Sequence, residues 1–251
     1  MILIKIGGSA IDNIENIIEN LLQKYSKQKI IIVHGGGKSV TQTAELLGKK
    51  QQWVVSPTGQ RSRYTDKETM QIFQMVMAGN INKEIVRLLQ KNGKQAIGLC
   101  GADANLIQAE RKKNLIVIEN GKKIMIEGGY TGKITQVNAE LLQSLVEQKI
   151  IPVIAPIALG KEFEMLNVDG DRLAAAICNH LEIEQIIFIT DVDGILDEKG
   201  KTISSINRQE LQTINVGFGM QKKIMSILEA KAKTITIVNG LNDLSGGTVI
   251  E

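Results

Sequence analysis

A single lysine stands inside an apolar run at the start of the chain, between Ile4 and Ile6. A lysine buried in a strand needs an anionic partner, because an unpaired charge in apolar surroundings is costly. The run ends at Gly7 and Gly8, where backbone N–H groups can approach an anion without obstruction by side chains. Lys5 is therefore a candidate for binding a negatively charged group. The competing interpretation is a lysine on an edge strand that points to water.

A second glycine loop repeats this arrangement. The apolar run at 30–33 leads into Gly35 to Gly37, and a helix is expected at about 38–47. A helix N-terminus adds partial positive charge to such a loop, so the two loops together indicate a site for phosphate-like anions. His34 ends the run, and we interpret it as a turn histidine hydrogen-bonded to the backbone.

Neither loop matches the common nucleotide motifs. A Walker A loop requires glycine at position 32, which is Ile32, and a GxGxxG dinucleotide loop requires glycine at position 40, which is Val40. This disfavours P-loop enzymes and nicotinamide-dependent dehydrogenases.

Buried strands and helices alternate along the chain, as expected for a three-layer αβα sandwich with a mainly parallel central sheet. Apolar runs predict further strands, and helical periodicity predicts the helices between them. The strands are expected at 96–100, 150–154, 185–190 and 234–238, and the helices at 13–24, 137–148, 171–181 and 220–232. Residues 67–91 predict one long helix or two, with Gly79 at the break.

A β-hairpin is expected to project from this sheet. Asn120 and Gly121 separate two strand-like runs, 115–119 and 122–127. Asn-Gly is the preferred pair for a type I′ turn, which needs a positive φ at both residues.

Composition excludes several other classes. A net charge of +3 with 3% aromatic residues offers little for nucleic-acid binding. Cys100 and Cys178 lie far apart and predict neither a disulfide framework nor a zinc site. No signal peptide or membrane-spanning run is recognisable, so we expect a soluble, cytoplasmic protein.

Five elements in order resemble those of the amino acid kinase family, and together they cover nearly the whole chain. The first two are Lys5-Ile6-Gly7-Gly8-Ser9 and His34-Gly35-Gly36-Gly37. The others are Asn167-Val168-Asp169-Gly170-Asp171, Thr190-Asp191-Val192-Asp193-Gly194-Ile195 and Gly219-Met220-Gln221-Lys222-Lys223. The resemblance implies the amino acid kinase fold and transfer of the γ-phosphoryl group of ATP, with Mg²⁺ held mainly by ATP oxygens and water.

Three further segments resemble the family's kinases for aminoadipate or glutamate attached to an amino-group carrier protein. They are 56–66, 128–134 and 152–158. N-acetylglutamate kinases are similar too, although they usually have a shorter segment where this chain has 60–66. N-acetylglutamate kinase is therefore the alternative function, and a non-catalytic nucleotide-binding regulator is a further one. The sequence leaves open whether aminoadipate, glutamate or both are used.

The resemblance implies a catalytic role for three residues. Lys5 and Lys223 would flank the transferring phosphoryl group, and Asp171 would hold the two lysines. Asp171 has a competing interpretation as the N-cap of the helix at 171–181. Asp169 departs from the family's usual asparagine, which adds a negative charge near the phosphates.

The resemblance also assigns binding residues. Gly36, Gly37, Arg63 and Asn167 would bind the amino-acid substrate, with Arg63 clamping its α-carboxylate. The ATP-binding residues would be Gly7, Gly8, Thr190, Asp191, Asp193, Gly219 and Met220. For the two aspartates an ordinary turn is the alternative, and for Met220 a place in the core.

Residues 1–165 would form the lobe for the amino-acid substrate and dimerisation, and residues 166–251 the ATP lobe. The chain begins at the first strand, without the N-terminal helix of hexameric relatives, so a homodimer is expected. The substrate-bearing carrier would be small and acidic. A basic cluster near the hairpin is a candidate for steering it, namely Arg111, Lys112, Lys113, Lys122, Lys123 and Lys133.

Overall fold

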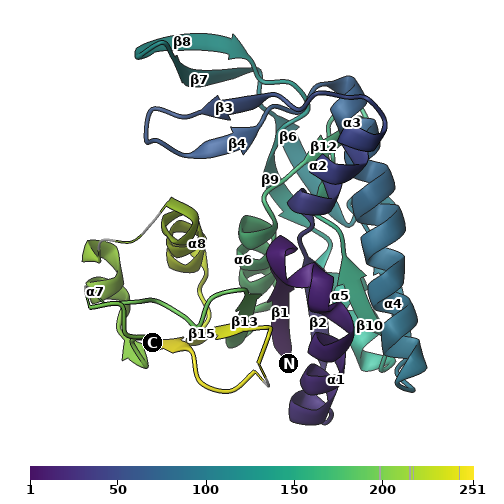
Figure 1. The fold of residues 1–251 in the computed structure, drawn as a ribbon. Coiled ribbons are helices and arrows are strands. Elements are labelled where there is room, and N and C mark those ends of the chain that lie inside the picture. The colour runs from purple at the N-terminus through teal and green to yellow at the C-terminus, as the bar shows by residue number, and fades with distance from the viewer. Residues whose placement is uncertain (198, 215, 217, 243) are drawn as a thin grey trace.

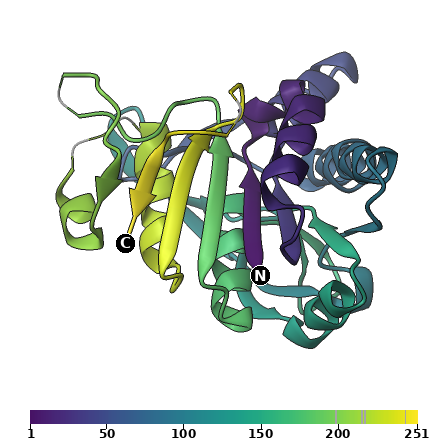
Figure 2. The ribbon, with the colours of Figure 1, turned by 90° about the horizontal axis from the view of Figure 1, so that it is seen from below.

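The computed structural model describes residues 1–251 except 198, 215, 217 and 243, and also leaves undescribed the side-chain surroundings of residues 218, 219 and 222. An eight-stranded sheet in the order β14-β16-β15-β13-β1-β2-β10-β5 forms its centre. These strands are β1 (Ile2–Ile6), β2 (Ile30–His34), β5 (Ala96–Leu99), β10 (Ile151–Ile154), β13 (Gln185–Thr190), β14 (Ser205–Ile206), β15 (Thr234–Asn239) and β16 (Thr248–Ile250). The strands from β15 to β5 run parallel, and Figure 2 shows β15, β13 and β1 side by side in yellow, green and purple.

Helices cover both faces of this sheet, so the predicted three-layer α/β fold is confirmed. They are α1 (Ile14–Tyr25), α2 (Gly37–Leu46), α3 (Lys67–Gln74), α4 (Asn82–Lys91), α5 (Ala139–Glu147), α6 (Gly170–Leu181), α7 (Arg208–Thr213) and α8 (Phe218–Glu229). In β1, Ile4 belongs to the core beneath α1 and α4, whereas Leu3 belongs to the core beneath α5, α6 and α8. Successive side chains of a strand point to opposite faces, so Lys5 lies on the same face as Leu3, toward α6.

A smaller sheet and two hairpins stand above the carboxyl ends of the central strands (Figure 1). The small sheet has the order β12-β11-β6-β9, with β6 (Ile107–Arg111), β9 (Gly132–Val137), β11 (Ile157–Leu159) and β12 (Met165–Asn167). The hairpins pair β3 (Trp53–Val55) with β4 (Arg61–Arg63), and β7 (Asn114–Glu119) with β8 (Lys122–Glu127). The predicted turn at Asn120 and Gly121 is confirmed, with φ values of 49° and 76°.

The long helical segment at 67–91 contains a π-helix, Met75–Ile81, between α3 and α4. The predicted break at Gly79 is therefore a change of helix type within a continuous segment. Side chains of the π-helix face the second glycine loop, because a Cβ on Gly36 would lie 2.1 Å from Ile81 Cδ1 and 3.1 Å from Met77 Sδ.

The division into lobes of residues 1–165 and 166–251 stays a prediction. The central sheet continues through both parts, since β1 pairs with β13. Within the described residues, none of the helices has the length and apolar character needed to cross a bilayer.

Two glycines provide a matched test of this packing. A Cβ on Gly101 would lie 2.5 Å from Ala158 Cα and 2.6 Å from the carbonyl oxygens of Ile107 and Ile157, whereas a Cβ on Gly79 meets nothing within 4 Å. Gly101→Ala should lower the free energy of unfolding by roughly 2–4 kcal/mol, because backbone atoms must move. Gly79→Ala should leave it unchanged or raise it by up to about 1 kcal/mol. Thermal or urea unfolding measures both, and a Gly101→Ala variant as stable as the parent would contradict the predicted clash.

Candidate active site

Three elements far apart in the chain bring a carboxylate and two lysines together. Lys5 on the central strand β1 places Nζ 2.6 Å from Asp171 Oδ1 at the start of α6. Lys223 on α8 places Nζ 3.3 Å from Asp171 Oδ2. Both lysines are buried, with exposed fractions of 7% and 8%. The interpretation of Lys5 as a solvent-facing edge lysine is therefore wrong, and its predicted anionic partner is Asp171.

The electrostatic effects within this Lys5–Asp171–Lys223 cluster differ from residue to residue. Burial alone would raise the pKa of Asp171, but the two ammonium groups outweigh it and hold that pKa well below its usual range. Burial lowers the pKa of Lys223, and the nearby charge of Lys5 lowers it further, against the opposing effect of Asp171. The cluster therefore holds an ionised carboxylate and an excess of positive charge.

The N-cap of α6 is Asp169, which corrects the interpretation of Asp171 as the cap. Asp169 Oδ1 accepts hydrogen bonds from the backbone N–H groups of Asp171 and Arg172, both at 3.0 Å. Asp169 thus satisfies backbone donors that the first turn of a helix leaves unpaired. Asp171 is left to bind the two lysines, and the acidic residue at 169 has a structural role of its own.

The two glycine loops pack backbone against backbone beside the cluster. A Cβ on Gly8 would lie 2.8 Å from Gly36 N and 3.1 Å from Gly37 N, and a Cβ on Gly35 would lie 2.9 Å from Gly8 N. Any larger residue at Gly8 or Gly35 would fill the space between the loops. This cradle of peptide N–H groups, with α2 beginning at Gly37, suits an anion such as a phosphate.

His34 lies beneath the second loop and is fully buried. Nδ1 lies 3.0 Å from the Gly35 carbonyl oxygen and Nε2 lies 3.2 Å from Asn82 Nδ2, which fits a neutral ring that donates from Nδ1 and accepts at Nε2. Burial lowers the pKa of His34 to about 4. His34 is the last residue of β2 and not part of a turn, but its predicted hydrogen bond to the backbone is confirmed.

Arg63 on β4 connects the β3–β4 hairpin to the second glycine loop. Nη2 donates to the Gly37 carbonyl oxygen at 2.7 Å and to Thr41 Oγ1 at 2.8 Å, and Nη1 donates to Gln51 Oε1. Three of the five guanidinium N–H donors are thus used within the chain, which leaves two for a substrate. The indole of Trp53 lies 5.1 Å from the Arg63 guanidinium and 4.5 Å from that of Arg61.

The segments that resemble the carrier-dependent kinases meet at Asn167. Asn167 Nδ2 donates to Thr65 Oγ1 at 2.9 Å, and the backbone N–H of Tyr130 donates to the Thr65 carbonyl oxygen at 2.7 Å. Thr65, in segment 56–66, therefore connects segment 128–134 to Asn167, which lies at the end of β12 just before α6.

The candidate nucleotide loop follows β13. Thr190 Oγ1 donates to Asp191 Oδ1 at 3.1 Å, and Asp193 Oδ1 accepts from Asn239 Nδ2 at 2.8 Å. Asp193 thus anchors this loop to the end of β15, which agrees with its interpretation as a turn residue. Met220 is half-buried and packs against the core. Gly219 lies in the first turn of α8, and its surroundings are outside what the structure describes.

A cleft of about 1000 Å³ lies at the carboxyl ends of the parallel strands, and most of the predicted catalytic and substrate-binding residues line it. Its lining includes Lys5, Gly8, Gly36, Gly37, Arg63, Asn167 and Asp171. Lys223 joins the site through Asp171. Gly7, Thr190, Asp191, Asp193 and Met220 are not part of this lining, and the structure leaves their predicted contact with ATP untested.

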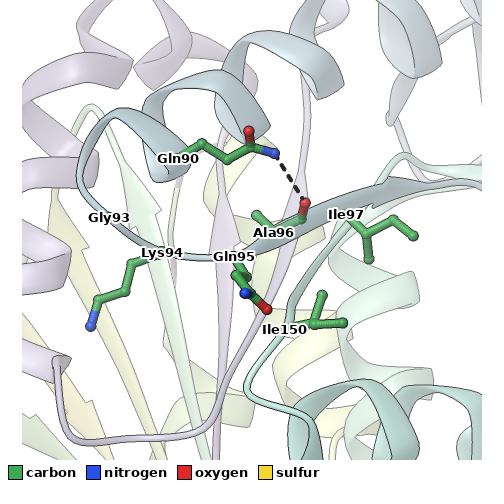
Figure 3. Close-up of a pocket in the computed structure, with 7 residues that line it drawn as sticks. All are labelled: Gln90, Gly93, Lys94, Gln95, Ala96, Ile97 and Ile150. Carbon is green, nitrogen blue, oxygen red and sulfur yellow. Dashed lines mark hydrogen bonds between the residues drawn. The ribbon is translucent and has the colours of Figure 1, made fainter.

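A smaller hollow of about 560 Å³ lies at the opposite end of the sheet. Figure 3 shows it at the start of β5, where Gln90 Nε2 donates to the Ala96 carbonyl oxygen at 3.5 Å. Ligands of parallel α/β sheets bind at the carboxyl ends of the strands, and this hollow lies at the amino ends. The larger cleft is therefore the candidate active site.

Three residues of this site were not predicted from the sequence. Trp53 and Arg172 line the cleft, and the buried Thr65 binds Asn167. Arg172 could have been predicted from its position directly after Asp171. The contacts of Trp53 and Thr65 depend on tertiary structure, which the sequence pattern does not show.

Comparison with known proteins identifies the family of this chain. Residues 1–239 match the model of the amino acid kinase family, and the chain belongs to that family. It is accordingly a phosphotransferase that acts on a carboxyl group, with ATP as the phosphate donor that the family implies.

Two similar curated proteins carry the same name, one of them provisionally. The LysW-aminoadipate/LysW-glutamate kinase of Saccharolobus solfataricus is 41% identical over 256 residues, covering 100% of this chain and 93% of that protein. A provisionally named counterpart from Cenarchaeum symbiosum (strain A) is 50% identical over 233 residues, covering 92% and 87%. Among solved structures, N-acetylglutamate synthase from Neisseria gonorrhoeae has a TM-score of 0.82 at 19% identity, covering 99% of this chain and 58% of that one, and shows the fold alone.

Arg63 should be sensitive to a substitution that keeps its charge. Arg63→Lys loses the planar fork and its hydrogen bonds to Gln51, Gly37 and Thr41, so we expect KM for the amino-acid substrate to rise by about tenfold or more, with KM for ATP nearly unchanged. Steady-state kinetics measures this, and a melting curve serves as the control. If only stability falls, Arg63 is structural and Arg61 becomes the candidate for binding the substrate carboxylate.

Proposed function

We propose that the protein transfers the γ-phosphoryl group of ATP to the side-chain carboxylate of aminoadipate or glutamate attached to an amino-group carrier protein. The product is an acyl phosphate. The observation that carries this proposal is the buried Lys5–Asp171–Lys223 cluster beside the glycine cradle, at the head of a cleft large enough for two anions. The names of the curated relatives support the carrier-linked substrate.

Charge neutralisation is the main task of the residues. A carboxylate is already ionised at neutral pH, so it needs no general base to become a nucleophile. One of its oxygens forms a bond to the γ-phosphorus while the bond from that phosphorus to the β,γ-bridging oxygen breaks, and ADP leaves. Lys5 and Lys223 offset the charge on the transferring group, and Asp171 holds their ammonium groups in place.

Peptide N–H groups complete the phosphate site. In this proposal Gly8 donates to phosphate oxygens, Gly36 and Gly37 donate to the amino-acid substrate, and Gly7, Thr190, Asp191, Asp193, Gly219 and Met220 bind ATP. The described residues contain no cluster of three or more His, Cys, Asp or Glu side chains that could hold a metal. Mg²⁺ therefore would reach the site on the ATP phosphates, where it neutralises charge, and would keep water ligands.

In this proposal the amino-acid end of the substrate lies beside the second glycine loop, where Arg63 donates to the Gly37 carbonyl oxygen. Arg63 has two N–H donors left for the α-carboxylate, and Asn167, held by Thr65, provides a polar contact. The retention of both buried lysines argues against a non-catalytic regulator, which would not need two cations at the γ-phosphate. We further propose a cytoplasmic homodimer that acts in lysine biosynthesis, arginine biosynthesis or both.

A hydroxamate assay tests this function. Hydroxylamine traps the acyl phosphate formed from ATP and one of three substrates, namely carrier-linked aminoadipate, carrier-linked glutamate and free N-acetylglutamate. We expect product from at least one carrier-linked substrate. Efficient use of N-acetylglutamate, with no reaction on either carrier-linked substrate, would make the protein an N-acetylglutamate kinase instead.

The two lysines should govern turnover more than ATP affinity. Lys5→Ala and Lys223→Ala each remove a preorganised charge at the transition state, and we expect kcat to fall by roughly 10²–10³-fold. The affinity for ATP should change much less, as measured by equilibrium titration. Near-normal turnover in either variant would exclude that lysine from the phosphoryl clamp.

The lowered pKa of Lys223 predicts the pH at which kcat/KM falls on the alkaline side of its pH profile. The charged form is the active one, so kcat/KM should decline as the pH rises through the folded-state pKa, below the range of an ordinary lysine. Lys223→Arg stays protonated throughout, so its limb should move to higher pH, even where its maximal rate is lower. Identical limbs for parent and variant would show that another group titrates.

A further inference from the structure

Two fully buried polar side chains lie behind the second glycine loop. They are His34, the last residue of β2, and Asn82, the first residue of α4. Burial of an imidazole and an amide costs free energy unless their hydrogen bonds are satisfied. Gly98 of the neighbouring strand β5 makes room for the amide, because a Cβ at that position would overlap Asn82 Oδ1. The hydrogen-bond partners of the two side chains therefore indicate why they are buried here.

The partners of Asn82 determine the orientation of its amide. Nδ2 lies 2.9 Å from the Val153 carbonyl oxygen, and Oδ1 lies 3.2 Å from Lys83 Nζ. A carbonyl oxygen only accepts and an ammonium group only donates, so no other assignment of the amide oxygen and nitrogen suits both partners. The second N–H of Nδ2 is then directed to His34 Nε2, at 3.2 Å. Lys83 is itself held by the Gly98 carbonyl oxygen, at 3.0 Å.

The orientation of Asn82 determines the tautomer of His34. Because Asn82 Nδ2 donates, His34 Nε2 must accept, and the proton of the neutral ring lies on Nδ1. Nδ1 donates to the Gly35 carbonyl oxygen at 3.0 Å. The donors thus all point in one direction, from Lys83 through Asn82 and His34 to the Gly35 carbonyl. We call these four groups the donor series.

The donor series ends on a peptide group of the cradle. The Gly35 carbonyl and the Gly36 N–H belong to the same peptide, and in a trans peptide they point in opposite directions. A donor that holds the carbonyl toward His34 therefore turns the Gly36 N–H away from His34. Glycine allows this peptide to rotate, since Gly36 has a φ of 155° that other residues rarely adopt. Gly36 lines the active-site cleft, so the rotation of this peptide matters for binding.

We infer that Asn82 and His34 are positioning residues, which fix the peptide between Gly35 and Gly36 so that the Gly36 N–H faces the substrate. This inference rests on the proposed function, in which Gly36 donates to the amino-acid substrate, and deepens it by naming the side chains that orient this donor. Neither side chain touches the substrate in this role. The hydrogen bond to the Gly35 carbonyl also polarises the shared peptide and strengthens its N–H as a donor.

NMR of the ¹⁵N-labelled protein tests the direction of the donor series. The chain has two histidines, so a His180→Gln variant assigns the signals of His34. At neutral pH we expect a proton on Nδ1 and none on Nε2. Asn82→Asp replaces the amide by a carboxylate that can only accept, so Nε2 should become protonated. A parent ring with its proton on Nε2, or a folded Asn82→Asp variant with unchanged ring nitrogens, would overturn the inference.

Two substitutions of similar size at His34 separate positioning from packing. His34→Asn keeps a donor near the place of Nδ1, whereas His34→Leu has none. KM for the amino-acid substrate should rise by about tenfold or more in His34→Leu, with kcat and KM for ATP within about threefold of the parent. His34→Asn should restore KM to within about threefold of the parent. A residue needed only for packing would give the opposite order, because a buried apolar site accepts leucine more readily than asparagine.

A second pair of variants provides the control on α4. Asn82→Leu should raise KM for the amino-acid substrate by about fivefold or more, because His34 loses its donor. Asn92→Leu makes the same change at the exposed C-cap of α4, where Asn92 donates only to Leu88 of its own helix, and should leave KM within about twofold of the parent. Melting curves show whether each variant is folded.

Equal KM values for folded His34→Leu and His34→Asn, or a parental KM in folded Asn82→Leu, would show that these residues do not position the substrate donor. Failure of the proposed function looks different, because the parent would then phosphorylate neither carrier-linked substrate. In that case the NMR spectra, and KM for whichever amino-acid substrate the parent does use, still decide the inference.

Discussion

A carboxylate buried between two ammonium groups is the interaction around which this structure is arranged. A buried charge is tolerated only with a partner, and removal of one member leaves an uncompensated charge. Lys5 comes from the centre of the sheet, Asp171 from the first turn of α6 and Lys223 from α8. Their meeting requires that β1 lie between β13 and β2, and that both helices cover the face of β1 on which Lys5 lies.

The glycine loops impose the second constraint, because their backbones must approach each other beside this cluster. Gly8 and Gly35 leave no room for a Cβ, and the side chains of Met77 and Ile81 close the space behind Gly36. The π-helix that carries Met77 and Ile81 is therefore part of the support of the cradle. A widened helical turn at a functional site is a recurring use of π-helices.

Local pattern predicted most strands of the central sheet and the hairpin turn, because each depends on neighbours in sequence. It also indicated that Lys5 needs an anionic partner, but it did not identify Asp171, which lies far away in the chain. The cap of α6 was harder, since Asp169 and Asp171 stand two residues apart and only the helix start at Gly170 decides between them. The bonds of Arg63 to Gln51, Gly37 and Thr41 depend on how the β3–β4 hairpin folds over α2. Periodicity holds no information about such a contact, so the engagement of Arg63 within the chain was not foreseen.

The excess of positive charge that favours phosphoryl transfer also lowers the stability of the protein when no ligand is bound. Burial, and then repulsion by Lys5, lower the pKa of Lys223. Asp171 can offset only one of the two cations, so the balance is completed by the anions that bind. Because ligands that bind the native state stabilise it by mass action, ATP and an anionic substrate should each raise the stability of the fold. Substrate binding and the packing of α6 and α8 are thereby linked through the single carboxylate that both lysines share.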